Sequence, residues 1–234
     1  MSYMHYFAYC KTTRPAAVTP SVHAPLPPRR TGPMVAPHSQ DRPDITMTHS
    51  DRPLLLLGLD DTDNAWSRGT GFRARQLGQA VTQAGIARLV GVTRHQLLFD
   101  PRIPYTSHNS SACLQFAPGA DRVALWHFCY RFMLDAAEDG SDIGLCLADA
   151  GQALALREHG RAAKREVLPI SSAAVAGAAC GARVAGLSGN RQGMIGAVAA
   201  RGLFAEGDDG RYIWAPAVRE LTDTQMDIAD FLAA

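Results

Sequence analysis

The chain has 234 residues, of which 47% are hydrophobic and 19% charged, and its formal net charge is +1. This balance is typical of an ordinary soluble protein with one core, and no segment approaches the roughly 20 apolar residues that a membrane-spanning helix needs. The five cysteines are odd in number and contain no C-x-x-C pair. They support neither a zinc ribbon nor a disulfide framework, so a reducing cytoplasm is the expected location.

The first fifty residues differ in composition from everything after them. Nine of the fourteen prolines lie at or before Pro53, and the segment has no apolar period that could bury a face. Residues 1–50 are therefore predicted to be a disordered tail, and residues 51–234 a single domain. Met47 stands just before the first predicted strand, so the natural start is either Met1 or Met47.

Basic residues are concentrated in the predicted tail. Residues 1–46 hold five Lys or Arg against two Asp, which leaves eighteen Lys or Arg against twenty Asp or Glu in the remainder. The predicted domain is thus slightly acidic, and its charge alone gives no support for binding tRNA or another nucleic acid.

A short apolar run, Leu54–Leu59, is followed at once by the carboxylates Asp60, Asp61 and Asp63. Such a run bounded by turn residues indicates a buried strand, and open α/β sheets place their ligands at the carboxyl ends of strands. Clustered carboxylates repel one another unless a cation or hydrogen-bond donors compensate, and hard oxygen ligands favour Mg²⁺ over zinc. The alternative is that these residues only end a strand and cap the next helix.

Gly69, Thr70 and Gly71 precede a run of good helix formers, and the predicted helix extends over Ser67–Ala84. The free backbone N–H groups at such a helix start can hold a phosphate group. Metal and phosphate would then meet at the end of the first strand.

Further along, strands and helices alternate. Strands are predicted at Arg88–Arg94, Ser111–Phe116 and Asp142–Asp149, and helices at Asp121–Glu138 and Ala150–Val167. The fold class is therefore predicted to be α/β, with a mixed β-sheet packed with helices in a single domain. The loop before Ser111 is rich in hydroxyl, amide and imidazole groups, so it either presents polar groups to a ligand or is a structured surface loop.

A second glycine-rich loop, Gly186–Gly196, opens an apolar helix. It lacks the G-K-[ST] ending of a Walker A loop and the ordered spacing of a dinucleotide fingerprint. Arg191, Gly193 and Gly196 form either a second anion site or a place of tight backbone packing.

Three separated motifs agree with one family. Gly58–Asp63, Ile103–Tyr105 with its polar loop, and Arg191–Ala200 resemble, in this order and at similar spacing, the N-terminal kinase-like domain of archaeal tRNA(Ile) 2-agmatinylcytidine synthetase. The resemblance spans about Leu54–Leu203. That family couples ATP cleavage to activation of a cytidine in the tRNA anticodon, which agmatine then attacks.

The resemblance implies that ATP and Mg²⁺ are the cofactors. It assigns Mg²⁺ and polyphosphate to Asp60, Asp61 and Asp63, and it implies that the glycine-rich loops frame the nucleotide.

The chain also departs from the family's pattern. Phe72 stands where the family carries a phosphorylated threonine, with Thr70 as the nearby substitute, and Thr106 and His108 stand where the family's loop carries Lys and Arg. The chain ends before the family's later domains, which include an OB-type domain and a zinc ribbon that hold the tRNA. Activity on tRNA is therefore not expected to carry over.

Transfer chemistry needs donors near the aspartates, so the loop Arg102–Ser110 is predicted to fold back over the end of the first strand. His108 would act as donor or acid and Asn109 as a positioning group, while Arg102 would contact phosphate with both arms of its guanidinium. Arg191 would approach from the second glycine loop. The predicted catalytic residues are Asp61, Thr70 and His108.

The favoured function is ATP- and Mg²⁺-dependent phosphoryl or nucleotidyl transfer to an unidentified small-molecule or RNA acceptor. One alternative is a non-catalytic nucleotide-binding module. Another is a haloacid-dehalogenase-like phosphatase, in which Asp61 and Asp63 form the D-x-D motif and Lys164 and Gly207–Asp209 form the later motifs. The phosphatase fits less well, because Tyr212 stands where those enzymes carry a further acid.

Overall fold

The computed structural model of the protein describes residues 53–106 and 108–216. The predicted tail, residues 1–50, and the predicted domain boundary at residue 51 lie outside these ranges. Within them, no helix combines the length and apolar character that crossing a membrane requires.

Six strands form one sheet in the order β5-β4-β1-β3-β2-β6. Their bounds are β1 (Leu55–Asp60), β2 (Leu89–Gln96), β3 (Ser110–Phe116), β4 (Gly144–Asp149), β5 (Arg183–Gly186) and β6 (Arg211–Trp214). The α/β class is confirmed. Every pair of neighbouring strands among the described residues is antiparallel, however, which differs from the mixed sheet predicted from the sequence.

The strand order explains this difference. The β1-α1-β2 unit connects two strands that run the same way, as the alternating pattern indicates, but β3 lies between them and pairs with both. The β3-α2-β4 unit is split by β1 in the same manner. Two interlocked split units make an antiparallel sheet from a chain with parallel crossovers.

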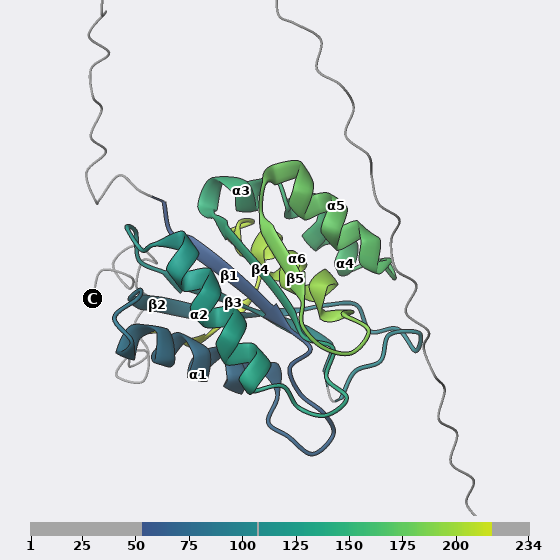
Figure 1. The fold of residues 1–234 in the computed structure, drawn as a ribbon. Helices are drawn as coiled ribbons and strands as arrows, with labels where there is room; N and C mark the ends of the chain where they lie inside the picture. Colours follow the sequence, from purple (N-terminus) through teal and green to yellow (C-terminus); the bar gives the residue numbers. More distant parts are fainter. Residues whose placement is uncertain (1–52, 107, 217–234) are drawn as a thin grey trace, which may run out of the picture. The chain divides into compact units, whose positions relative to one another are not determined.

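The sheet lies between two layers of helices (Figure 1). Helices α1 (Thr70–Gln83) and α2 (Arg122–Asp135) cover one face. The other face carries α6 (Gly193–Phe204), and α4 (Arg157–Ala163) and α5 (Ile170–Cys180) pack on α6. The helix predicted over Ala150–Val167 is interrupted between α3 (Ala150–Leu154) and α4, where the Leu156 carbonyl lies against Gly202.

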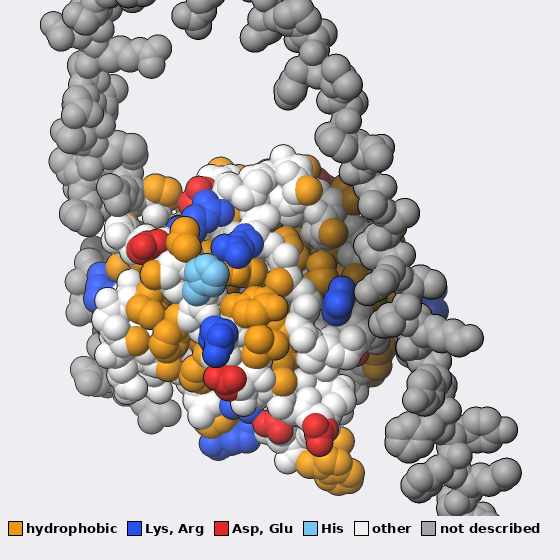
Figure 2. Space-filling model, in the orientation of Figure 1, with side chains coloured by type: hydrophobic (Ala, Val, Ile, Leu, Met, Phe, Trp, Pro, Cys, Tyr) orange, Lys and Arg blue, Asp and Glu red, His pale blue; other side chains and the backbone are white. Residues whose placement is uncertain are grey.

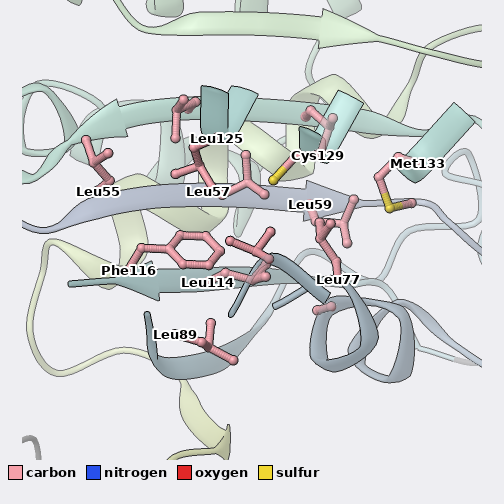
Figure 3. Packing of buried hydrophobic residues seen from close by; sticks show 14 of the residues in the cluster. Leu55, Leu57, Leu59, Leu77, Leu89, Leu114, Phe116, Leu125, Cys129 and Met133 are labelled. Carbon is pink, nitrogen blue, oxygen red and sulfur yellow. The ribbon is translucent and has the colours of Figure 1, made fainter. Parts of the chain in front are cut away.

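Alternation along β1 divides its side chains between the two layers. Leu55, Leu57 and Leu59 point into the main core with α1 and α2, beside Leu125 and other residues of α2 (Figure 3). All three are at most 8% exposed, and burying each leucine contributes about 1.5–3 kcal/mol. Leu56 and Gly58, which alternate with these leucines, face α6 instead.

Two glycines allow α6 to lie directly on β1. A Cβ at Gly58 would stand 1.8 Å from the Ala197 carbonyl oxygen, and a Cβ at Gly196 would stand 1.7 Å from Oδ2 of Asp60. Gly193 packs in the same way against Gly144 and donates its N–H to the Asp142 carbonyl over 2.9 Å. Of the two interpretations of the second glycine loop, tight backbone packing is therefore observed, and it brings the start of α6 beside Asp60.

Candidate functional site

The carboxylates at the end of β1 lie between the starts of α1 and α6. Asp60 is the last residue of the strand and lies beside Gly196 of α6. Asp61 has a left-handed backbone with φ of 54°, a conformation that costs a residue with a side chain about 1–3 kcal/mol. Such strain is concentrated at functional sites, and here it turns the chain sharply at the end of the strand.

Asp63 joins three segments. Its Oδ1 accepts hydrogen bonds from the backbone N–H and the hydroxyl of Thr70, both over 3.0 Å. Its Oδ2 accepts one from the Thr106 hydroxyl over 2.7 Å. Asp63 thus holds the start of α1, as the capping interpretation requires, and it also fastens the polar loop over the end of β1.

Asp60 and Asp61 form no ion pair with a basic side chain among the described residues. Burial raises the pKa of Asp60 well above its usual value, and the neighbouring Asp61 adds to the shift. The pKa of Asp61 rises to about 6 because of burial first, and then because of Asp142 and Asp63. A bound cation would lower both pKa values, since it would stabilise the ionised carboxylates.

These side chains open on a pocket, which we call the acidic cavity. One wall is apolar and comes from the loop after β2, the segment after α4 and the start of α6. Within the described part of the chain, no Lys or Arg belongs to the lining. The residues that line it are Asp60, Asp61, Asp63, Thr70, Leu97, Ile103, Pro104, Tyr105, Thr106, His108, Asn109, Ser110, Ala163, Glu166, Val167, Leu168, Gln192, Gly193, Ile195 and Gly196.

The loop between β2 and β3 lies where it is predicted, over the end of β1. The Phe99 and Tyr105 rings meet edge to face with 5.4 Å between their centroids. The centroid of the His108 ring lies 6.5 Å from that of Phe99. Asn109 donates from Nδ2 to the Leu98 carbonyl over 2.6 Å, so it braces the loop while it lines the cavity. The structure therefore brings His108 and Asn109 together with the aspartates.

Two predicted arginines lie elsewhere. Arg102 donates from Nε and Nη2 to Asp100 over 2.8 and 2.7 Å, and its side chain is 71% exposed. Arg191 has φ of 68°, and its side chain packs against Gly186. Neither residue lines the acidic cavity, because a local carboxylate holds the first and the turn before α6 directs the second away.

A second pocket adjoins the first, and we call it the arginine cavity. It contains Gly69 and Gly71, which are predicted to hold phosphate, but these two glycines do not line the acidic cavity. The residues that line it are Asp63, Arg68, Gly69, Thr70, Gly71, Phe72, Arg75, Arg94, Thr106, His108, Ser110 and Ile213.

Sequence reasoning missed the three arginines of this second cavity. Arg68 lies in the loop before α1, Arg75 lies on α1, and Arg94 lies on β2. The one local sign that Arg68 and Arg75 lie near each other is that they are only seven residues apart. Arg94 is distant in sequence and lies near them because of how the strands are arranged.

The later motifs of the phosphatase alternative do not reach the aspartates. The Lys164 ammonium donates to Asp209, whose other oxygen lies 2.9 Å from Nδ1 of the buried His95. Neither Lys164 nor Asp209 lines either cavity. In this structure the pair joins α4 to the turn before β6.

In the part of the chain that the structure describes, no group of three or more His, Cys, Asp or Glu is arranged as a complete metal site. Mg²⁺ rarely needs one, because it usually takes one or two carboxylates and completes its shell with water and substrate phosphates. The hard oxygens of Asp60 and Asp61, which lack a cationic partner among the described residues, fit that role.

Comparison with solved structures identifies the fold. The apo form of TiaS, a tRNA agmatidine synthetase, matches with a TM-score of 0.56 at 21% identity over 64% of this chain and 35% of that one. A complex of TiaS with its tRNA and ATP matches with a TM-score of 0.57 at 23% identity over 64% of this chain and 36% of that one. The protein has a TiaS-like fold. A tRNA fluorescent labeling enzyme matches similarly, with a TM-score of 0.57 at 24% identity over 64% of this chain and 36% of that one.

The chain thus spans 35–36% of the length of these TiaS-like structures. No family model and no curated protein matches the chain. The fold implied by the three sequence motifs is confirmed.

Proposed function

We propose that the protein is an ATP- and Mg²⁺-dependent transferase that moves a phosphoryl or nucleotidyl group to an acceptor. The observation that carries this proposal is the acidic cavity, in which Asp60 and Asp61 have no Lys or Arg partner among the described residues and lie opposite an apolar wall. The TiaS-like fold supports it, since TiaS has been crystallised with ATP and with AMPCPP.

In this proposal Asp60 and Asp61 hold Mg²⁺, which would neutralise charge on the phosphate groups. The base would lie against the apolar wall, where Tyr105 offers a partly exposed ring for stacking. Gly193 and Gly196 pack closely against the ends of β4 and β1, which places the start of α6 at the wall of the cavity beside Asp60.

Asp63 and Thr70 form the boundary where transfer would occur. The Thr70 hydroxyl donates to Asp63 and accepts hydrogen bonds from the backbone N–H and the hydroxyl of Thr62 over 3.4 and 3.3 Å, so it is held in one orientation at the cavity wall. His108 stands on the opposite loop, where it could donate to charge that develops on the transferred group. These three residues line both cavities, which suits groups that act between two substrates.

Calorimetric titration with ATP tests the metal half of the proposal. Asp61→Asn should weaken Mg²⁺-dependent ATP affinity at least tenfold, which is about 1.4 kcal/mol, because one ligand charge is lost. Asp135→Asn, at the end of α2 and exposed, is the matched control and should bind as the wild type does. Equal affinity in Asp61→Asn and the control would leave these residues as strand-ending and capping groups.

Turnover separates transfer from binding alone. Labelled ATP incubated with protein, Mg²⁺ and a candidate acceptor should yield ADP and a phosphorylated acceptor if a phosphoryl group moves. It should yield pyrophosphate and an adenylylated acceptor if a nucleotidyl group moves, and pyrophosphate with free AMP if water cleaves the α–β bond. Binding without any product would favour the non-catalytic module, which Phe72 at the place of the family's threonine already suggests.

A further inference from the structure

The arginine cavity has the opposite charge from its neighbour. Arg68, Arg75 and Arg94 line it against a single carboxylate, Asp63. Every ion pair found among the described residues involves other basic side chains, so none of these three guanidinium groups is neutralised by a carboxylate. Unpaired positive charge that converges on one cavity is the complement of an anionic ligand.

Contacts with neutral groups hold two of the guanidinium groups in place. Arg94 donates from Nε to the Ser110 hydroxyl over 2.8 Å, which leaves its terminal nitrogens for another partner. The Arg68 guanidinium lies 4.2 Å above the centroid of the Phe72 ring. Arg75 is partly buried on α1 and has no hydrogen-bond acceptor among the described residues. Guanidinium groups that are already oriented lose less entropy when they bind an anion.

The two cavities share Asp63, Thr70, Thr106, His108 and Ser110. A ligand in the arginine cavity would therefore lie across this shared wall from a nucleotide in the acidic cavity. The first turn of α1, which contains no acidic residue, also borders the arginine cavity and adds the positive end of its dipole.

We propose that the arginine cavity binds the acceptor substrate, and that this acceptor is a small molecule carrying a phosphate group. The inference rests on the proposed transfer function and names the class of its second substrate. Arg75 and Arg94 contact the phosphate, and the shared wall presents the rest of the acceptor to the transferred group.

A small acceptor suits the charge of the molecule better than an RNA strand does. The chain beyond residue 46 carries eighteen basic against twenty acidic residues. On the face shown in Figure 2, a small number of Lys and Arg side chains lie among hydrophobic and acidic ones. Arg73, Arg122, Arg161 and Lys164 are already committed to ion pairs. An RNA strand, in contrast, presents many phosphates in succession.

Titration with ribose 5-phosphate tests the inference, using full-length protein saturated with Mg²⁺ and a non-hydrolysable ATP analogue. Wild type should bind ribose 5-phosphate but not ribose. Arg75→Gln and Arg94→Gln should each weaken binding roughly tenfold to a hundredfold, as expected for loss of a hydrogen bond to a charged group. Arg88→Gln is the matched control, because Arg88 is exposed and lines neither cavity.

The same two substitutions should leave Mg²⁺-dependent ATP affinity within about twofold of wild type. A parallel loss of ATP affinity would mean that the cavity holds the nucleotide's own phosphates, and it would overturn the inference. Absence of ribose 5-phosphate binding to wild type would also overturn it. So would tighter binding of a single-stranded RNA whose affinity falls steeply with salt.

Failure of the proposed function gives a different result. If wild type does not bind Mg²⁺ and ATP, the transfer function is refuted, and titration of nucleotide-free protein with ribose 5-phosphate still decides whether the arginines form a phosphate site.

Discussion

The acidic cavity and the arginine cavity share one wall, yet they are built in different ways. The first takes its charge from Asp60, Asp61 and Asp63, within four consecutive positions that begin at the last residue of β1. The second takes its charge from a loop, from α1 and from β2. A charged site that comes from one segment can be predicted from sequence, whereas a site assembled from several elements depends on their arrangement in the fold.

Substitution of Gly58 should give the largest effect and should separate the two cavities. In Gly58→Ala the new methyl group would stand 1.8 Å from the Ala197 carbonyl oxygen, so α6 must move away from β1. We expect a loss of about 3 kcal/mol in the free energy of unfolding, measured by urea denaturation. Gly151→Ala is the control, since its methyl group would meet only ordinary contacts.

The folded fraction of the Gly58→Ala protein should lose Mg²⁺-dependent ATP binding, because α6 forms a wall of the acidic cavity alone. Its affinity for ribose 5-phosphate should change little. Equal loss of both would show that the two cavities do not behave as separate sites.

Titration of Asp61 in the acidic cavity should make the free energy of unfolding depend on pH. With its pKa raised to about 6, folded Asp61 binds a proton more tightly than in the unfolded chain. Without metal, the free energy of unfolding should therefore fall as the pH rises from about 4 to 6 and should level off above that. The fall is at most about 3 kcal/mol, and solvent screening makes it smaller.

Urea denaturation in EDTA at pH 4.5 and pH 7 measures this contribution as the difference between wild type and Asp61→Asn. The substitution should make the protein relatively more stable at pH 7 than at pH 4.5. Added Mg²⁺ should remove the advantage of the variant. A difference that is the same at both pH values would contradict the assigned pKa shift.

The shared wall should give an intermediate effect. Thr106→Val removes the 2.7 Å hydrogen bond to Asp63 and keeps the side-chain shape. We expect a loss of about 1 kcal/mol or less, because the site is exposed, together with faster amide hydrogen exchange in residues 103–110. Thr82→Val, far from either cavity on α1, should leave exchange in that loop unchanged.

The arginine cavity should contribute least to the stability of the ligand-free protein. Arg75→Gln removes a charge that has no carboxylate partner among the described residues, so the free energy of unfolding should change by no more than about 0.5 kcal/mol. Thermal unfolding in low salt measures it. A loss above roughly 1.5 kcal/mol would indicate that Arg75 has a structural role. The phosphate affinity of the Arg94→Gln protein would then decide whether the arginine cavity binds phosphate.

Several features of the site could be predicted because their causes are local. The apolar run Leu54–Leu59 specifies a buried strand, and the carboxylates must follow it wherever the strand lies. Gly69 and the helix formers after it specify the start of α1. The glycines of the second loop indicate close backbone approach, although local sequence leaves open what approaches.

Other features required the strand order. Insertion of β3 between β1 and β2 made the sheet antiparallel and brought Arg94 beside Arg68 and Arg75. The predicted role of Arg102 found no support, because Asp100, two residues away, holds its guanidinium.

The sequence by itself therefore determined the strand, the carboxylates and the helix start of the acidic cavity, since hydrophobic period and capping act over a few residues. Only the tertiary structure decided which hydrogen bonds hold the covering loop to the aspartates and which basic side chains converge beside them. Those contacts join positions such as Asp63 and Thr106, which are 43 residues apart. Their free energy depends on how the strands pair, and no local pattern encodes that pairing.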